Sequence, residues 1–85
     1  MEKRVALIGI VVENFNSVEA LNALLHEYSG IIIGRFGLPY KERNISIMSI
    51  AVDGSANDIN TLCGKIGALS GVSSKTVFAK LADGE

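Results

Sequence analysis

Residue types that often carry chemistry are scarce in this sequence, which has one cysteine, Cys63, one histidine, His26, and no tryptophan. A single cysteine excludes a framework of internal disulfides and suits a reducing compartment, so we expect a cytoplasmic protein. Each of the two residues lies mid-helix without a second ligand at metal-binding spacing, and we expect no metal and no other cofactor. A catalytic Cys-His pair would require two helices to bring them together. We instead expect a solvated His26 and a buried or half-buried Cys63.

The sequence also lacks an excess of either charge. Eight Lys and Arg residues face nine Asp and Glu residues, giving a net charge of −1, and no long block of like charge occurs. A basic face for nucleic acid is therefore not expected. The most apolar run, residues 5–12, is too short to cross a membrane and has no signal-peptide cleavage site, so we expect no membrane association.

Hydrophobic residues, by contrast, are abundant. They make up 48% of the 85 residues, a length that predicts one domain, residues 1–85, with one core. Small domains have a high ratio of surface to volume and usually need more polar positions than this. Some apolar surface is therefore expected to meet another chain.

Four strands are predicted. Residues 30–53 form two Ile-rich runs joined by a polar turn, residues 41–44, and Pro39 favours an extended chain just before it. Residues 3–12 are apolar at both odd and even positions, which is typical of a central strand covered on both faces. The more polar residues 72–81 predict an edge strand, followed by a frayed tail at residues 83–85.

The first predicted helix begins near residue 17. Asn16 with Glu19 three residues later is typical of a capping box, with Ser17 as the alternative N-cap, and Gly30 is the expected C′ glycine. Its apolar stripe has helical spacing and consists of Val18, Leu21, Leu24, Leu25 and Tyr28.

The second predicted helix follows a turn at Gly54 and has Ser55 with Asp58 as its capping signature. Gly71 is expected to end it. Gly64 and Gly67 lie inside this helix, where each glycine costs about 1 kcal/mol relative to alanine, so we expect both to allow close approach to a strand. The apolar stripe is Ile59, Leu62, Ile66 and Leu69.

The predicted order is βαββαβ, an α+β ferredoxin-like fold in which a four-stranded antiparallel sheet carries both helices on one face. The first and third strands should be central. Alternation separates Ile31 and Ile33 from Ile32 and Phe36, and it separates Ile45 and Ile47 from Met48, Ile50 and Val52. One set of each pair must face away from the helices, and this apolar open face predicts a homo-oligomer, either a dimer or a tetramer.

The candidate ligand site is the turn between the first strand and the first helix, Asn14, Phe15, Asn16 and Ser17. Free N–H groups at a helix start lie there beside short polar side chains, which suits a small effector. Ordinary helix capping is the structural alternative. The runner-up site is the open sheet face. A further candidate is an anion-binding corner at the hairpin made of Arg35, Tyr40, Lys41 and Arg43, for which a solvated turn is the favoured alternative.

Two segments resemble a known family. Gly-Arg-Phe-Gly-Leu-Pro-Tyr-Lys-Glu-Arg-Asn-Ile, residues 34–45, and Gly-Lys-Ile-Gly-Ala-Leu-Ser-Gly-Val, residues 64–72, are similar to the iron-only hydrogenase system regulators, small ACT-like domains. The resemblance implies a ferredoxin-like fold and a regulatory role linked to the hydrogenase of anaerobic metabolism. ACT-like domains often bind an amino acid at the first strand-to-helix turn, commonly with an aspartate and a glycine, where this chain has Asn14, Phe15 and Asn16.

A more distant resemblance is to the C-terminal domain of nickel-responsive repressors, which shares the order of elements and the Gly-Val pair at residues 71–72. That family holds nickel through strand histidines and a cysteine. The predicted strands here contain neither residue, so the nickel site does not carry over.

Together these features predict a non-enzymatic regulatory module that senses a ligand or acts on a protein partner, with a role in transcriptional regulation among its expected outputs. The alternatives are a small ferredoxin-like enzyme, for which no catalytic residues are identified, and a DNA-binding regulator that acts with a separate partner.

Overall fold

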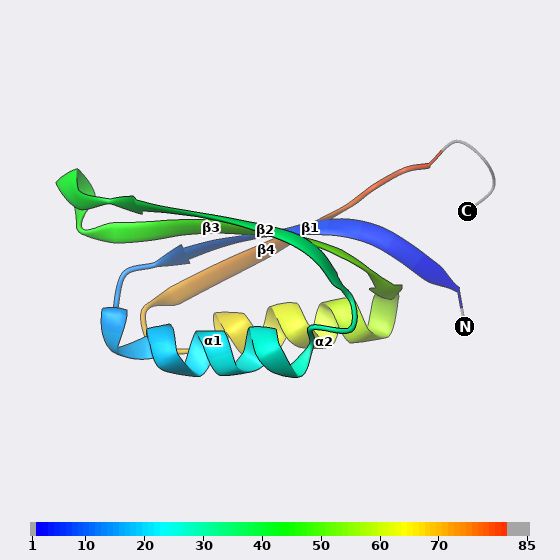
Figure 1. Ribbon diagram of the computed structural model, residues 1–85, viewed down its shortest axis with the longest axis horizontal. Helices are drawn as coiled ribbons and strands as arrows, with labels where there is room; N and C mark the ends of the chain where they lie inside the picture. The colour runs from blue at the N-terminus through cyan, green and yellow to red at the C-terminus, as the bar shows by residue number, and fades with distance from the viewer. Residues whose placement is uncertain (1, 82–85) are drawn as a thin grey trace.

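The computed structural model describes residues 2–81, and its elements follow the predicted βαββαβ order. Helices α1 (Val18–Glu27) and α2 (Ala56–Gly67) lie side by side on one face of a single antiparallel sheet (Figure 1). The sheet order is β2-β3-β1-β4, so the fold is ferredoxin-like, with the first and third strands central and the last strand at an edge, as predicted. The strands are β1 (Lys3–Val12), β2 (Ile32–Tyr40), β3 (Ile45–Ser55) and β4 (Val72–Phe78).

The core lies between the sheet and the helices. Along β1 the even-numbered residues from Ala6 to Val12 point towards the helices and are at most 1% exposed, whereas the odd-numbered ones point to the opposite face. This period of two is what a strand requires when each of its faces meets a different environment. The core also contains Leu21, Leu25, Ile50, Val52, Ile59, Leu62, Ile66 and Val72.

A β-bulge in β2 changes which residues share a face. Ile32 pairs with Val52 and Gly34 pairs with Ala51, so Ile33 is an extra residue between them. After the bulge, Phe36 lies on the face that the helices do not cover, while Ile32 packs against the core. The predicted grouping of Ile32 with Phe36 is therefore wrong, because strict alternation does not anticipate an inserted residue.

The two helix starts differ. At α2 the Ser55 hydroxyl accepts a hydrogen bond from the Asp58 N–H at 3.0 Å, which confirms the predicted cap. At α1 a 3₁₀ turn, η1 (Phe15–Ser17), comes first, and the Asn14 side chain accepts from the Asn16 N–H at 3.0 Å. The capping prediction at Asn16 is wrong, because Asn16 lies inside the 3₁₀ turn that Asn14 caps. Ser17 does occupy the N-cap position of α1, but its side chain makes no capping hydrogen bond.

Gly30 and Gly54 do not have their predicted roles. α1 ends at Glu27 with Tyr28 as its C-cap, and Gly30 does not have the left-handed backbone of a C′ glycine. Gly54 is a buried residue of β3 and forms no turn. A Cβ at Gly54 would lie 2.9 Å from Ile31 Cγ2, so this glycine lets the chain that leads into β2 pack over β3.

Three glycines of α2 and its C-terminal turn were also predicted to have structural roles. A Cβ at Gly67 would lie 2.8 Å from Ser74 Oγ, which confirms the close approach to a strand, whereas nothing lies within 4 Å at Gly64 and that prediction is wrong. Gly67 is the last residue of α2, and Gly71, predicted to end the helix, lies beyond it in the turn before β4, with a φ of +69°. The predicted tail, residues 83–85, lies outside the described residues.

Candidate functional site

The turn predicted to bind a ligand, residues 14–17, is hydrogen-bonded to the turn that joins α2 to β4. The Ser17 hydroxyl, in a residue only 7% exposed, donates to the Ser70 carbonyl at 2.6 Å. The Asn14 side-chain amide donates to Ser70 Oγ at 3.3 Å, and the Glu13 N–H donates to the Gly71 carbonyl at 2.7 Å. Asn14 and Ser17 therefore hold two distant chain segments together.

The other two residues of this turn face solvent. Phe15 is 50% exposed, and Asn16 is also exposed. Sequence reasoning placed all four residues in one site, and the structure does bring them into one turn. Its exposed part consists of an aromatic ring and a carboxamide, while the other two side chains are engaged within the fold.

The sheet face opposite the helices is uncovered and apolar. Its large hydrophobic side chains are between 37% and 64% exposed, as the sequence predicts for a face that the helices leave open. An exposed apolar patch of this kind marks an interaction surface in a soluble protein. We call it the open face, and its exposed hydrophobic residues are Leu7, Phe36, Leu38, Tyr40, Ile47 and Val77.

Gly9 forms a hollow in the middle of the open face. It pairs with Ser49 on one side and Lys75 on the other, and because glycine has no side chain and serine a short one, the two central strands have little side-chain bulk in this row. The hollow has a volume of about 620 Å³, and Phe36, which pairs with Ser49, stands in the same row. Sequence reasoning did not identify this hollow, although a glycine inside an apolar strand is a known signal of close approach by another group.

The structure separates the members of the predicted anion corner. Lys41 and Arg43 lie in the 3₁₀ turn η2 (Lys41–Arg43) at the tip of the hairpin. Arg35 instead points to the helix side, where its guanidinium donates to Asn22 Oδ1 of α1 at 3.5 Å. The hairpin turn and Arg35 therefore belong to different surfaces.

His26 is exposed and Cys63 is half-buried, as predicted. The Cys63 thiol lies 3.4 Å from Ser74 Oγ, which itself donates to the Cys63 carbonyl at 2.7 Å. Within residues 2–81, no group of three or more His, Cys, Asp and Glu side chains is placed to hold a metal ion. Over the same residues, no helix has the length and apolar character needed to cross a membrane.

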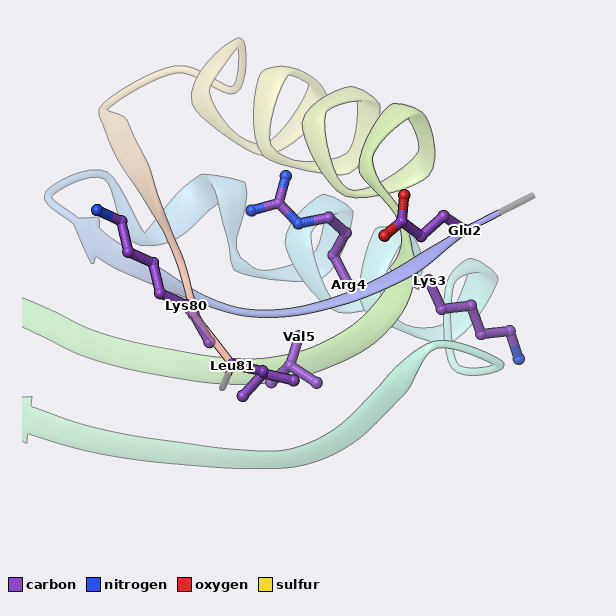
Figure 2. Close-up of a pocket in the computed structure, with 7 residues that line it drawn as sticks. Glu2, Lys3, Arg4, Val5, Lys80 and Leu81 are labelled. Carbon is purple, nitrogen blue, oxygen red and sulfur yellow. The ribbon is translucent and has the colours of Figure 1, made fainter. Parts of the chain in front are cut away.

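A further hollow lies where the ends of β1 and β4 meet (Figure 2). Its cationic side chains do not converge, because the ammonium groups of Lys3 and Lys80 point in opposite directions. The third cation, Arg4, stacks on the Phe78 ring with its guanidinium carbon 4.4 Å from the ring centre. This arrangement fits a cation–π contact that stabilises the strand ends.

Comparisons with known proteins give a family and a fold. The sequence model of the TM1266-like family, described provisionally as iron-only hydrogenase system regulators, matches residues 4–76. The solved structure of uncharacterized protein TM1266 from Thermotoga maritima is 38% identical, with a TM-score of 0.89 over 93% of this chain and all of that one. None of the curated proteins matches the chain significantly.

A more distant structural similarity is to the divalent ion tolerance protein CutA1 from Ehrlichia chaffeensis. That protein is 16% identical, with a TM-score of 0.52 over 99% of this chain and 89% of that one. At this identity the similarity concerns the fold alone.

Proposed function

The chain belongs to the TM1266-like family, and we propose that it is a non-enzymatic regulatory module of the iron-only hydrogenase system that works as a self-assembled oligomer in the cytoplasm. The family description supports the regulatory role. The free thiol of Cys63 suits the reducing environment of that compartment. Self-assembly is inferred from the uncovered, apolar open face.

A second copy of the chain is the occupant that best fits this face. The sheet runs along the longest dimension of the molecule, whose extents are 42 × 22 × 17 Å (Figure 1). Stable interfaces bury about 800 Å² per partner, which in a domain of this size requires contact over most of one face. Asp53 and Lys75 lie on the same face and carry opposite charges, which suits a self-complementary contact.

The row containing Phe36 and Gly9 suggests how two copies would fit. In a two-fold dimer the same patch faces itself, so the Phe36 ring of each copy would enter the Gly9 hollow of the other. A projecting ring and a hollow on one face are complementary in shape. This contact would bury two large aromatic side chains near the centre of the interface.

Multi-angle light scattering on the purified chain tests the assembly. We expect a dimer, or a tetramer built from dimers, at micromolar concentration. A stable, soluble monomer under those conditions would overturn this part of the proposal. The variant Ser29→Ala, whose substitution lies away from the open face, should assemble like the parent chain.

The turn formed by Asn14, Phe15, Asn16 and Ser17 is our proposed effector site. The exposed Phe15 ring and the Asn16 carboxamide would contact the ligand, while Asn14 and Ser17 keep the turn in place. The test is a titration with free amino acids followed by amide NMR. Shifts centred on Phe15 and Asn16 would support the assignment, and shifts confined to the hairpin near Pro39 would contradict it.

We further propose that any effect on transcription passes through a protein partner that makes the DNA contacts. The net charge of −1 is unfavourable for binding a phosphate backbone directly. A gel-shift assay with the chain alone should therefore show no retarded DNA. Salt-sensitive binding by the chain alone would contradict this proposal.

A further inference from the structure

A groove runs between α1 and the edge strand β2, on the side of the sheet opposite to the open face. Its volume is about 380 Å³, at the lower end of the range for small-molecule sites. Three of its residues share one stripe of α1 at the i, i+3, i+4 spacing, one lies in the turn that follows the helix, and two come from β2. The lining consists of Asn22, Leu25, His26, Ser29, Ile32 and Arg35.

The floor of this groove is apolar. Leu25 is 3% exposed, and Ile32 is partly buried against the core. The bulge in β2 explains the neighbouring polar rim. It places Arg35 opposite Ile50, on the helix side of the sheet, and so directs a guanidinium towards α1.

Arg35 has a neutral partner in this groove. Its guanidinium donates to the Asn22 carboxamide oxygen at 3.5 Å, a long hydrogen bond, and within residues 2–81 it has no carboxylate within ion-pair distance. No aspartate or glutamate lines the groove. Because arginine stays charged and presents a planar fork of N–H donors, it can donate two parallel hydrogen bonds to a carboxylate.

Two further polar side chains line the groove beside Arg35. The His26 imidazole and the Ser29 hydroxyl lie along the same groove and can donate further hydrogen bonds. One cation beside an apolar floor matches a ligand with one negative charge and a short hydrocarbon chain. We propose that the groove binds a small aliphatic carboxylate, whose carboxyl group pairs with Arg35 and whose hydrocarbon part lies on Leu25 and Ile32.

This site is separate from the open face. Arg35 and Phe36 are neighbours on β2 but point to opposite sides of the sheet, so the groove stays accessible when two open faces pack together. A monomer in light scattering would therefore contradict the proposed assembly without affecting the proposed groove.

A titration with sodium butyrate, followed by amide NMR, tests the groove. Sodium chloride at equal ionic strength controls for salt, and 1-butanol controls for the hydrocarbon part alone. We expect saturable shifts in the millimolar range at the amides of Ser29, Ile32 and Arg35, and no comparable response to 1-butanol.

Three arginine variants extend the test. Loss of a charge-assisted pair should weaken butyrate binding at least about tenfold in Arg35→Gln, while Arg43→Gln, at the hairpin tip, should bind like the parent chain. Arg35→Lys keeps the charge without the fork and should bind with intermediate affinity, which separates recognition from loss of the fold. An absent or unsaturable response, equal binding by Arg35→Gln, or shifts at Phe15 and Asn16 instead would each overturn the proposal.

Discussion

Replacing Gly71 by alanine should weaken the contact between the turn that precedes α1, which contains the predicted effector site, and the turn that joins α2 to β4. Gly71 has a φ of +69°, a conformation that costs an L-residue about 1–2 kcal/mol. The new Cβ would also lie 2.5 Å from Asn14 Cβ and 2.9 Å from the Asn14 backbone nitrogen. A backbone atom cannot rotate away, so the two turns must separate.

The separation would weaken three hydrogen bonds between the two turns, those donated by the Glu13 N–H, the Asn14 side-chain amide and the Ser17 hydroxyl. If all three are lost at about 1 kcal/mol each, the total with the backbone strain is about 4–5 kcal/mol. The whole domain should have about 4–13 kcal/mol of stability, from ~0.05–0.15 kcal/mol per residue. Gly71→Ala should therefore leave the protein marginally stable.

Urea denaturation followed by circular dichroism measures this change. The matched control is Gly64→Ala, because Gly64 lies inside α2 with nothing within 4 Å of a new Cβ. That substitution should stabilise the chain by about 0.5–1 kcal/mol through helix propensity. A Gly71→Ala variant within about 1 kcal/mol of the parent would refute the argument from strain and overlap, since the strain alone amounts to that much.

Three further predictions follow from the same structure. Phe36→Ser should shift the chain towards monomer in light scattering while its circular dichroism spectrum stays unchanged, because an exposed ring contributes to assembly and little to the core; an unchanged oligomer would contradict the proposed contact. Ser17→Ala should destabilise the fold by about 0.5–1.5 kcal/mol in thermal unfolding, since the nearly buried Ser17 hydroxyl no longer donates to the Ser70 carbonyl at 2.6 Å; no change in Tm would argue against this role. Protein purified without chelator should contain no stoichiometric nickel, zinc or iron by elemental analysis, because no ligand cluster occurs within residues 2–81, and a full equivalent of any of these metals would disprove it.

The strands and their order could be predicted because hydrophobic alternation and turn chemistry are local signals. The Ile-rich runs beside residues 41–44 form the hairpin, and Ser55 caps α2 as its spacing with Asp58 predicts. The apolar character of the open face was also predictable. Two helices on one face leave the alternate residues of every strand without cover.

The rest depends on contacts between distant segments. Ser70 lies more than fifty residues from Ser17, so no local pattern shows that it takes the Ser17 hydroxyl away from helix capping. The approach of Arg35 to Asn22 likewise depends on the bulge at Ile33, which propensities do not signal. Gly54 was misplaced in a turn because its role, making room for Ile31, exists only once β2 lies beside β3.

The bulge in β2 has a consequence for protein engineering. Deleting Ile33 should leave every later pair unchanged, because Gly34 would follow Ile32 directly and still lie opposite Ala51. Losing the bulge while keeping Ile33 has the opposite effect: if Ile33 paired with Ala51, every later residue of β2 would change face, which would bring the Arg35 guanidinium to the open face and turn the Phe36 ring towards α1. One residue without a pairing partner therefore keeps a charge out of one surface and an aromatic ring out of the other.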